Sequence, residues 1–134
     1  MPLAFCFHDT NEEMLKLDFG EVEAILRELK QRYSIVEVLQ FNERLDHRYI
    51  FENKIRAPRH GWQPQKSKYS PVIGFLKGKS YDFACVFTNR EGIDIEALTD
   101  PEQPVVIYTP RVLPESIEAK DEIKIGPQKP SNKD

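Results

Sequence analysis

The chain has 134 residues, of which 40% are hydrophobic and 31% charged, and a formal net charge of −3. A chain of this length forms one globular domain whose core needs neither a disulfide nor a metal. No apolar run approaches the ~20 residues of a membrane span, and residues 1–8 lack the basic start of a signal peptide. These features argue against a membrane protein, and we expect a cytoplasmic location.

The first forty residues predict a strand, a helix and a second strand. Residues 3–8 are apolar and indicate a buried strand. Asp18 and Glu21 have the spacing of a capping box before a helix over residues 19–33, whose apolar residues recur on one face. Residues 34–41 are β-branched and apolar. Two strands joined by a helix predict a parallel pair.

Two shorter segments are less regular. Thr10 and Glu13 repeat the capping-box spacing and indicate a turn of helix. Residues 42–56 fit two structures: Asn42 favours a helix, whereas the run at residues 49–51 suits a strand equally well. We favour the helix.

The middle of the chain predicts a loop and then a hairpin. Residues 57–70 hold proline, glycine and basic residues, which are typical of a loop. Residues 71–76 and 81–88 read as two strands, and Gly78-Lys79 suits the two-residue turn between them.

The remaining segments complete the predicted fold. Residues 93–98 indicate a strand or a helical turn, residues 105–108 a strand and residues 116–125 one more short element. We expect an α/β (or α+β) domain over residues 1–125, followed by a disordered tail over residues 126–134. Its mixed sheet has about five or six strands, an N-terminal β-α-β unit and a C-terminal hairpin region.

The two cysteines, Cys6 and Cys85, each lie in an apolar run. Such thiols behave as small buried hydrophobes, so we expect both to be free. A disulfide between adjacent strands is the alternative. Without a Cys-x-x-Cys pair, the sequence offers neither a zinc ribbon nor a dithiol redox site.

Positive charge is concentrated between Asn53 and Tyr81. This stretch holds seven basic residues and no acid, whereas the rest of the chain holds twelve basic and twenty-two acidic residues. Cations interleaved with aromatic rings are typical of single-stranded nucleic-acid grooves, in which cations hold phosphates and rings stack on bases. The candidate binding residues over residues 54–79 are Lys54, Arg56, Arg59, His60, Trp62, Lys66, Lys68, Lys77 and Lys79. A solvated or protein-facing surface is the alternative interpretation.

Three carboxylates and one histidine are candidates for catalysis. Asp94 and Glu96 are two residues apart, and Asp82 precedes them, so the three would hold Mg²⁺ for phosphodiester hydrolysis if they converged. Ordinary solvent-facing strand acids are the favoured explanation, since exposed carboxylates usually have no such role. His60 lies among basic residues and is a candidate general acid or base for RNA cleavage without a metal.

Over residues 3–88, the predicted order of strand, helix, strand and helix, followed by residues 70–79 (Ser-Pro-Val-Ile-Gly-Phe-Leu-Lys-Gly-Lys), resembles the second half of thioredoxin-like domains. In that family a cis-proline precedes a strand and a glycine-containing hairpin. Residues 8–17 contain no cysteine, so the redox pair of the family is missing. The resemblance therefore implies a redox-inactive scaffold that binds another protein.

These patterns favour a small, non-enzymatic binding or regulatory protein that contacts an anionic partner, such as nucleic acid, through residues 54–79. The alternatives are a metal-dependent nuclease built on Asp82, Asp94 and Glu96, and a redox-inactive thioredoxin-like scaffold for a protein partner. We expect no cofactor and no membrane association.

Overall fold

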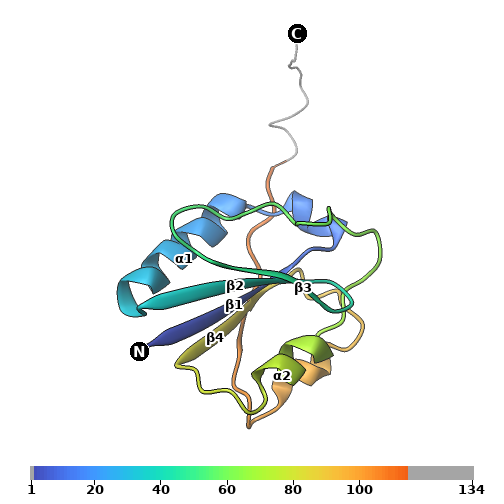
Figure 1. Ribbon diagram of the computed structural model, residues 1–134. Helices are drawn as coiled ribbons and strands as arrows, with labels where there is room; N and C mark the ends of the chain where they lie inside the picture. Colours follow the sequence, from blue (N-terminus) through green and yellow to red (C-terminus); the bar gives the residue numbers. More distant parts are fainter. Residues whose placement is uncertain (1, 115–134) are drawn as a thin grey trace.

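The computed structural model describes residues 2–114, so the expected element over 116–125 and the tail over 126–134 lie outside the described residues. One five-stranded mixed sheet forms the centre, in the order β3-β2-β1-β4-β5 (Figure 1). Only β3 is antiparallel to its neighbour, β2; the other neighbouring strands are parallel. The strands are β1 (Leu3–Asp9), β2 (Ile35–Phe41), β3 (Leu45–Ile50), β4 (Phe83–Phe87) and β5 (Val106–Tyr108). The mixed α/β sheet and its N-terminal β-α-β unit are confirmed.

Helix α1 (Phe19–Arg32) joins β1 to β2 and covers one face of the sheet. The Asp18 side chain caps it by accepting a hydrogen bond from the Glu21 backbone N–H at 3.3 Å. Val22 and Leu26, one turn apart, are fully buried against the sheet. The helix and its Asp18 cap are therefore confirmed, whereas the Glu21 carboxylate accepts from Tyr108 and Arg111 and does not complete the capping box.

A 3₁₀ helix, η1 (Glu12–Lys16), follows β1, but its cap differs from the prediction. The Asn11 side chain accepts the Glu13 N–H at 2.9 Å. Thr10 is buried and donates its hydroxyl to the Phe41 carbonyl at 3.0 Å. Because Thr10 is held by β2, it does not cap the helix.

The preference for a helix over residues 42–56 is wrong, since residues 45–50 form β3. A tight turn closed by the Asn42 N–H and the Arg44 carbonyl at 3.1 Å folds the chain back along β2. In β3 the Tyr49 side chain is buried, while Arg48 and Ile50 beside it are exposed. Antiparallel pairing with β2 therefore overrides the helical spacing.

The predicted hairpin is also wrong, because residues 70–76 form helix α2 (Ser70–Leu76). Pro71 occupies its first turn, where a missing N–H costs nothing. The Asp94 carboxylate accepts the backbone N–H groups of Tyr69 at 2.5 Å and Ser70 at 3.1 Å. Gly78, with a φ of +77°, turns the chain after the helix. The hairpin that the thioredoxin-like resemblance implies therefore does not form here.

The last described segments lie at the β5 edge. The second helical turn, η2 (Ile95–Thr99), confirms the helical alternative for residues 93–98, and β5 confirms the final strand. Beyond β5, Arg111 pairs with Asp18 at 2.9 Å and donates its backbone N–H to Glu21 at 2.9 Å. These contacts lower the pKa of both carboxyls, through the Arg111 side chain for Asp18 and its backbone N–H for Glu21. The segment after β5 is thus fastened to the start of α1.

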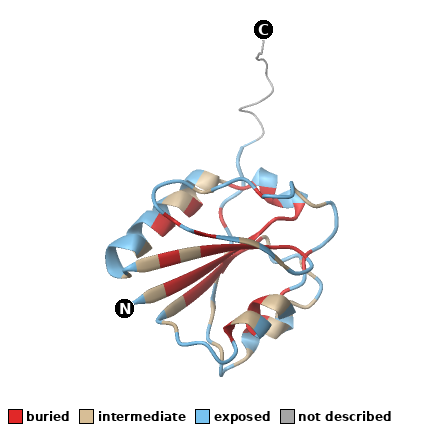
Figure 2. Cartoon of the chain, in the orientation of Figure 1, coloured by how far each residue is buried: buried red, intermediate tan, exposed pale blue. Residues whose placement is uncertain are grey.

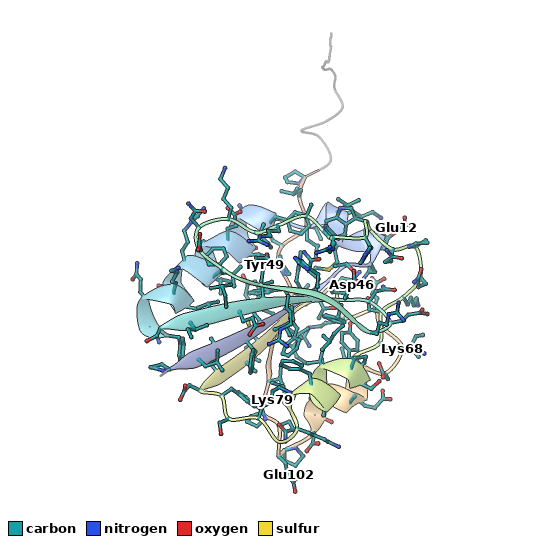
Figure 3. All side chains as sticks on the ribbon, viewed as in Figure 1. Glu12, Asp46, Tyr49, Lys68, Lys79 and Glu102 are labelled. Atoms are coloured by element: carbon teal, nitrogen blue, oxygen red, sulfur yellow. The ribbon has the colours of Figure 1, made fainter. Side chains whose placement is uncertain are left out.

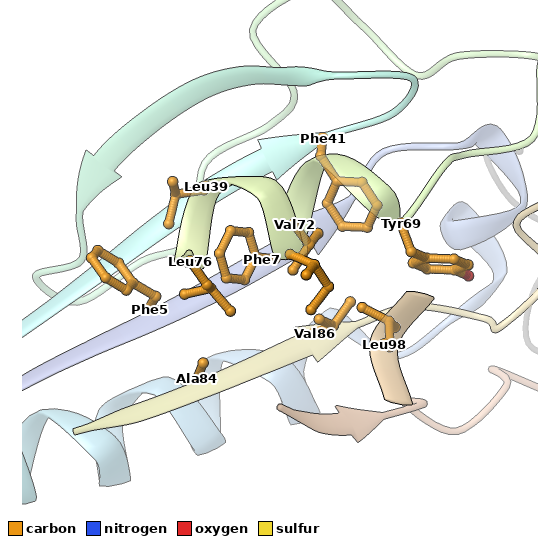
Figure 4. Packing of buried hydrophobic residues seen from close by; sticks show 11 residues of the cluster. Phe5, Phe7, Leu39, Phe41, Tyr69, Val72, Leu76, Ala84, Val86 and Leu98 are labelled. Atoms are coloured by element: carbon orange, nitrogen blue, oxygen red, sulfur yellow. The ribbon is translucent and has the colours of Figure 1, made fainter. Parts of the chain in front are cut away.

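Two apolar layers pack on opposite faces of the sheet (Figure 2). Alternate residues of β1 supply each layer, because side chains on a strand point to opposite faces. Ala4 and Cys6 pack on the α1 side, whereas Phe5 and Phe7 pack under α2, as Figure 4 shows.

Among the described residues, no helix is both long and apolar enough to cross a membrane.

The two cysteines lie opposite each other on neighbouring strands, Cys6 on β1 and Cys85 on β4. Both are buried and free, which confirms the expectation. A hydrogen bond with Cys85 and burial raise the pKa of the Cys6 thiol.

Candidate functional site

The carboxyl ends of β1, β2 and β4 meet at one edge of the sheet. The chain leaves β1 toward β2 on one side and later returns to β4 on the other side. In open α/β sheets, the crevice beyond the strand ends at such a reversal is the usual place for a ligand. His8 and Asp9 end β1, and Thr88 directly follows β4.

Asp9 lies inside that crevice. It is fully buried and accepts hydrogen bonds from the Thr88 hydroxyl at 2.7 Å, the Asn11 N–H at 3.0 Å and the Ser67 hydroxyl. Thr88 in turn is bonded to the Tyr69 hydroxyl at 2.7 Å. A buried carboxylate satisfied by several donors is stable without a ligand. The reversal point is therefore filled by protein.

His8 lies on the other face of β1, beneath two aromatic rings. Its ring centroid is 5.7 Å from that of Phe19 and 6.1 Å from that of Trp62, and those two rings stack on each other at 5.4 Å. Only 2% of His8 is exposed, and neither ring nitrogen has a hydrogen-bond partner among the described residues. Burial lowers the pKa of His8 to about 4, so the ring is neutral at neutral pH.

The segment between β3 and α2, residues 51–69, wraps around the carboxyl edge. The Gln63 N–H donates to the Thr10 carbonyl at 2.9 Å, and the Lys68 N–H donates to the Asn42 carbonyl at 2.8 Å. These bonds fix the segment beside the ends of β1 and β2. Between this segment and the turn from β2 to β3 lies a cleft of about 510 Å³.

We call this hollow the carboxyl-edge cleft. Its lining is polar and consists of Asn42, Glu43, Arg44, Asp46, His60, Gln63 and Gln65. The Asn42 amide is itself held, since it donates to the Ser67 hydroxyl at 2.9 Å and to the Gln65 carbonyl at 3.2 Å. A volume of this size lies within the usual range for small-molecule sites.

Two lining residues form a pair. His60 Nδ1 lies 2.6 Å from the Asp46 carboxylate, with 62% of the His60 side chain and 26% of the Asp46 side chain exposed. A carboxylate bound to one ring nitrogen orients the imidazole and leaves the other nitrogen free for proton transfer. Sequence reasoning named His60 but could not name its partner, because Asp46 belongs to the strand that was expected to be a helix.

The nine predicted binding residues do not form one surface. Lys54 and Arg56 lie beside α1: the neighbouring Ile55 N–H donates to Glu23, and the Arg56 guanidinium stacks 4.5 Å from the Tyr49 ring centre. Lys79 lies at the far end of α2, over the Phe75 ring (Figure 3).

One exposed cation, Arg44, lines the cleft, and three more exposed cations adjoin its lining residues. Arg59 precedes His60 and Lys66 follows Gln65 in the chain, and the Lys68 backbone N–H donates to the Asn42 carbonyl at 2.8 Å. We call these four the rim cations: Arg44, Arg59, Lys66 and Lys68. Arg44 escaped the sequence analysis, because it lies outside the acid-free stretch and beside Glu43.

The three candidate carboxylates are placed apart. Asp82 accepts the Leu3 N–H at 2.7 Å, at the amino end of β1, whereas Asp94 caps α2 near the carboxyl edge. β4 separates them, a distance of about 16 Å for five residues at the usual rise. Glu96 is exposed on η2. Within residues 2–114, no three histidine, cysteine, aspartate or glutamate side chains are grouped so as to hold a metal ion.

Comparisons with known proteins do not extend this description. No protein-family model matches the chain, and searches of curated proteins and of solved structures gave no match.

Proposed function

We propose that the protein binds single-stranded nucleic acid at the carboxyl edge of its sheet. One observation supports the proposal: Arg44 lines a polar cleft, the other three rim cations adjoin its lining residues, and the partly exposed Trp62 precedes the lining residue Gln63. Phosphates would pair with the rim cations, and a base would stack on the exposed part of the indole. This arrangement of cations and a ring is the usual one for single-strand recognition.

Single strands suit the site better than a duplex for a geometric reason. The Trp62 indole lies against Phe19, so only part of it is open to a ligand. The bases of a duplex are stacked on one another and present only their edges, whereas an unpaired base can swing out onto a ring. The exposed Gln65 amide of the cleft lining offers a donor and an acceptor for the edge of such a base.

Binding can be measured by fluorescence anisotropy with a labelled single-stranded RNA, the same sequence as DNA, and a duplex. The test variant is Arg59→Gln/Lys66→Gln/Lys68→Gln, which neutralises three rim cations. The matched control is Lys77→Gln/Lys79→Gln, which removes two cations of the same acid-free stretch beyond the end of α2. Because Trp62 is the single tryptophan of the chain, its fluorescence reports directly on stacking.

We expect the wild type to bind single strands more tightly than duplex, with a steep dependence on salt. The test variant should flatten the slope of log K against log salt by about 2, since each lost phosphate contact removes about 0.7 for a single strand. The control should keep the wild-type slope. Equal losses in both variants would place the site elsewhere, and no binding at ~50 mM salt, where phosphate contacts are strongest, would refute nucleic-acid binding.

A further inference from the structure

The pair formed by Asp46 and His60 has the geometry of a proton-transfer device. The two residues are fourteen positions apart, and the fold joins them when β3 turns back along β2 and the following segment returns to the carboxyl edge. Asp46 Oδ1 contacts His60 Nδ1 at 2.6 Å. A neutral imidazole with Nδ1–H bound to a carboxylate presents its Nε2 lone pair as a base.

The groups around this pair suit a phosphodiester. Arg44 shares the cleft lining with both residues, and a guanidinium can neutralise phosphate oxygens through two parallel hydrogen bonds. Lys66 and Lys68 extend the positive rim along the segment that borders the cleft. A strand held by these cations would carry its backbone past the imidazole.

We propose that His60 is the general base of an RNA-cleaving site and that the substrate is single-stranded RNA bound at the carboxyl-edge cleft. This inference rests on the proposed function. Asp46 acts through His60 and is a positioning residue, and Arg44 stabilises the negative charge of the five-coordinate phosphorus.

The reaction balances without any added reagent. His60 Nε2 takes the proton of a ribose 2′-hydroxyl, the 2′-oxygen forms a bond to phosphorus, and the bond from phosphorus to the 5′-oxygen breaks. The leaving 5′-oxygen takes a proton from water, and the imidazolium returns its proton to water. The products are a 2′,3′-cyclic phosphate and a 5′-hydroxyl, and no water is consumed. DNA lacks the 2′-hydroxyl, so it should bind but stay intact.

The test uses the full chain, a short labelled single-stranded RNA and the same sequence as DNA, in excess EDTA. The variants are His60→Gln and Asp46→Asn, with His47→Gln as the matched control because His47 stacks on Tyr49. All four proteins are purified in parallel, and their thermal melting is compared, so that loss of activity is separated from unfolding. Cleavage products are analysed for the cyclic phosphate, and binding is measured separately by anisotropy.

We expect the wild type and His47→Gln to cleave RNA and leave DNA intact. His60→Gln should lose about 10²-fold or more in cleavage rate, the usual contribution of a general base, with RNA affinity unchanged. Asp46→Asn should lower kcat and leave KM unchanged, since it disturbs the orientation of the imidazole and not the rim cations.

The outcomes separate this inference from the proposed function. Binding of RNA without cleavage would overturn the catalytic role of His60 and leave the binding function standing. Cleavage that persists in His60→Gln, or that extends to DNA, would also overturn it. Absence of both binding and cleavage would remove both proposals together.

Discussion

Acidification should destabilise the protein through His8, because burial of this side chain disfavours its protonated form. The pKa of His8 falls from 6.5 to about 4 in the folded protein, because the charged ring would lie unsolvated beneath Phe19 and Trp62. Below pH 6.5 the unfolded chain therefore takes up a proton that the folded chain refuses. The free energy of unfolding then decreases as pH falls from 6.5 toward 4.

The magnitude follows from the two pKa values. The difference between the folded and unfolded pKa values of His8 corresponds to about 3 kcal/mol of unfolding free energy. About 2 kcal/mol of this should already be lost at pH 5. Because only 2% of His8 is exposed, solvent does little to screen the effect. A loss of this size is a large fraction of the total stability of a small domain.

The assay compares urea unfolding at pH 7 and pH 5, followed by circular dichroism, for wild type, His8→Phe and His8→Leu. Neither variant titrates at this position, so each should lose about 2 kcal/mol less than the wild type between the two pH values. Their absolute stabilities at pH 7 can differ through packing. Equal losses in wild type and both His8 variants would refute the reasoning.

Two further predictions concern the contacts that hold α2. Asp94→Ala removes the acceptor for two N–H groups at the start of the helix, so thermal melting should show a loss of about 1 kcal/mol, as for other lost caps; an unchanged melting temperature would mean that water replaces the carboxylate. Gly92→Ala places a Cβ 2.4 Å from the Tyr69 ring and 2.6 Å from the Ser67 carbonyl, so we expect a loss of about 1–3 kcal/mol by overpacking. The exposed Gly74, whose added Cβ meets nothing within 4 Å, is the matched control, and equal losses in both alanine variants would contradict the steric reason.

The first part of the fold could be predicted because its signals are local. The buried run of β1, the capped apolar face of α1 and the apolar run of β2 each lie within a short stretch of sequence. The helix needs only its own spacing and the adjacent Asp18 to be recognised. Local preference and final structure agree here, which is typical of a consistent fold.

The errors arose where distant residues decide the structure. Residues 71–76 were expected to form a strand, but Asp94, far along the chain, supplies the acceptor that starts α2. Likewise, β3 owes its form to pairing with β2, and nothing within residues 45–50 reveals that partner. Because these interactions join segments that sequence reading treats separately, local patterns could not predict them.

The same cause explains what was found and missed at the candidate site. His60 was named from its basic surroundings, but Asp46 and Arg44 join it only through the turn before β3. The acid-free stretch passes from beside α1, around the carboxyl edge and along α2, so its charges face three directions.

Charge that is clustered in sequence is therefore only partly clustered in space, and the distinction has an experimental consequence. If a partner recognises only net positive charge, Lys77 and Lys79 should matter as much as the rim cations. If it recognises the carboxyl edge, the geometry of the cleft decides, and Arg44 should matter although it lies outside the acid-free stretch. An Arg44→Gln variant that weakens binding while Lys77→Gln/Lys79→Gln does not would attribute recognition to the fold and not to the composition of one segment.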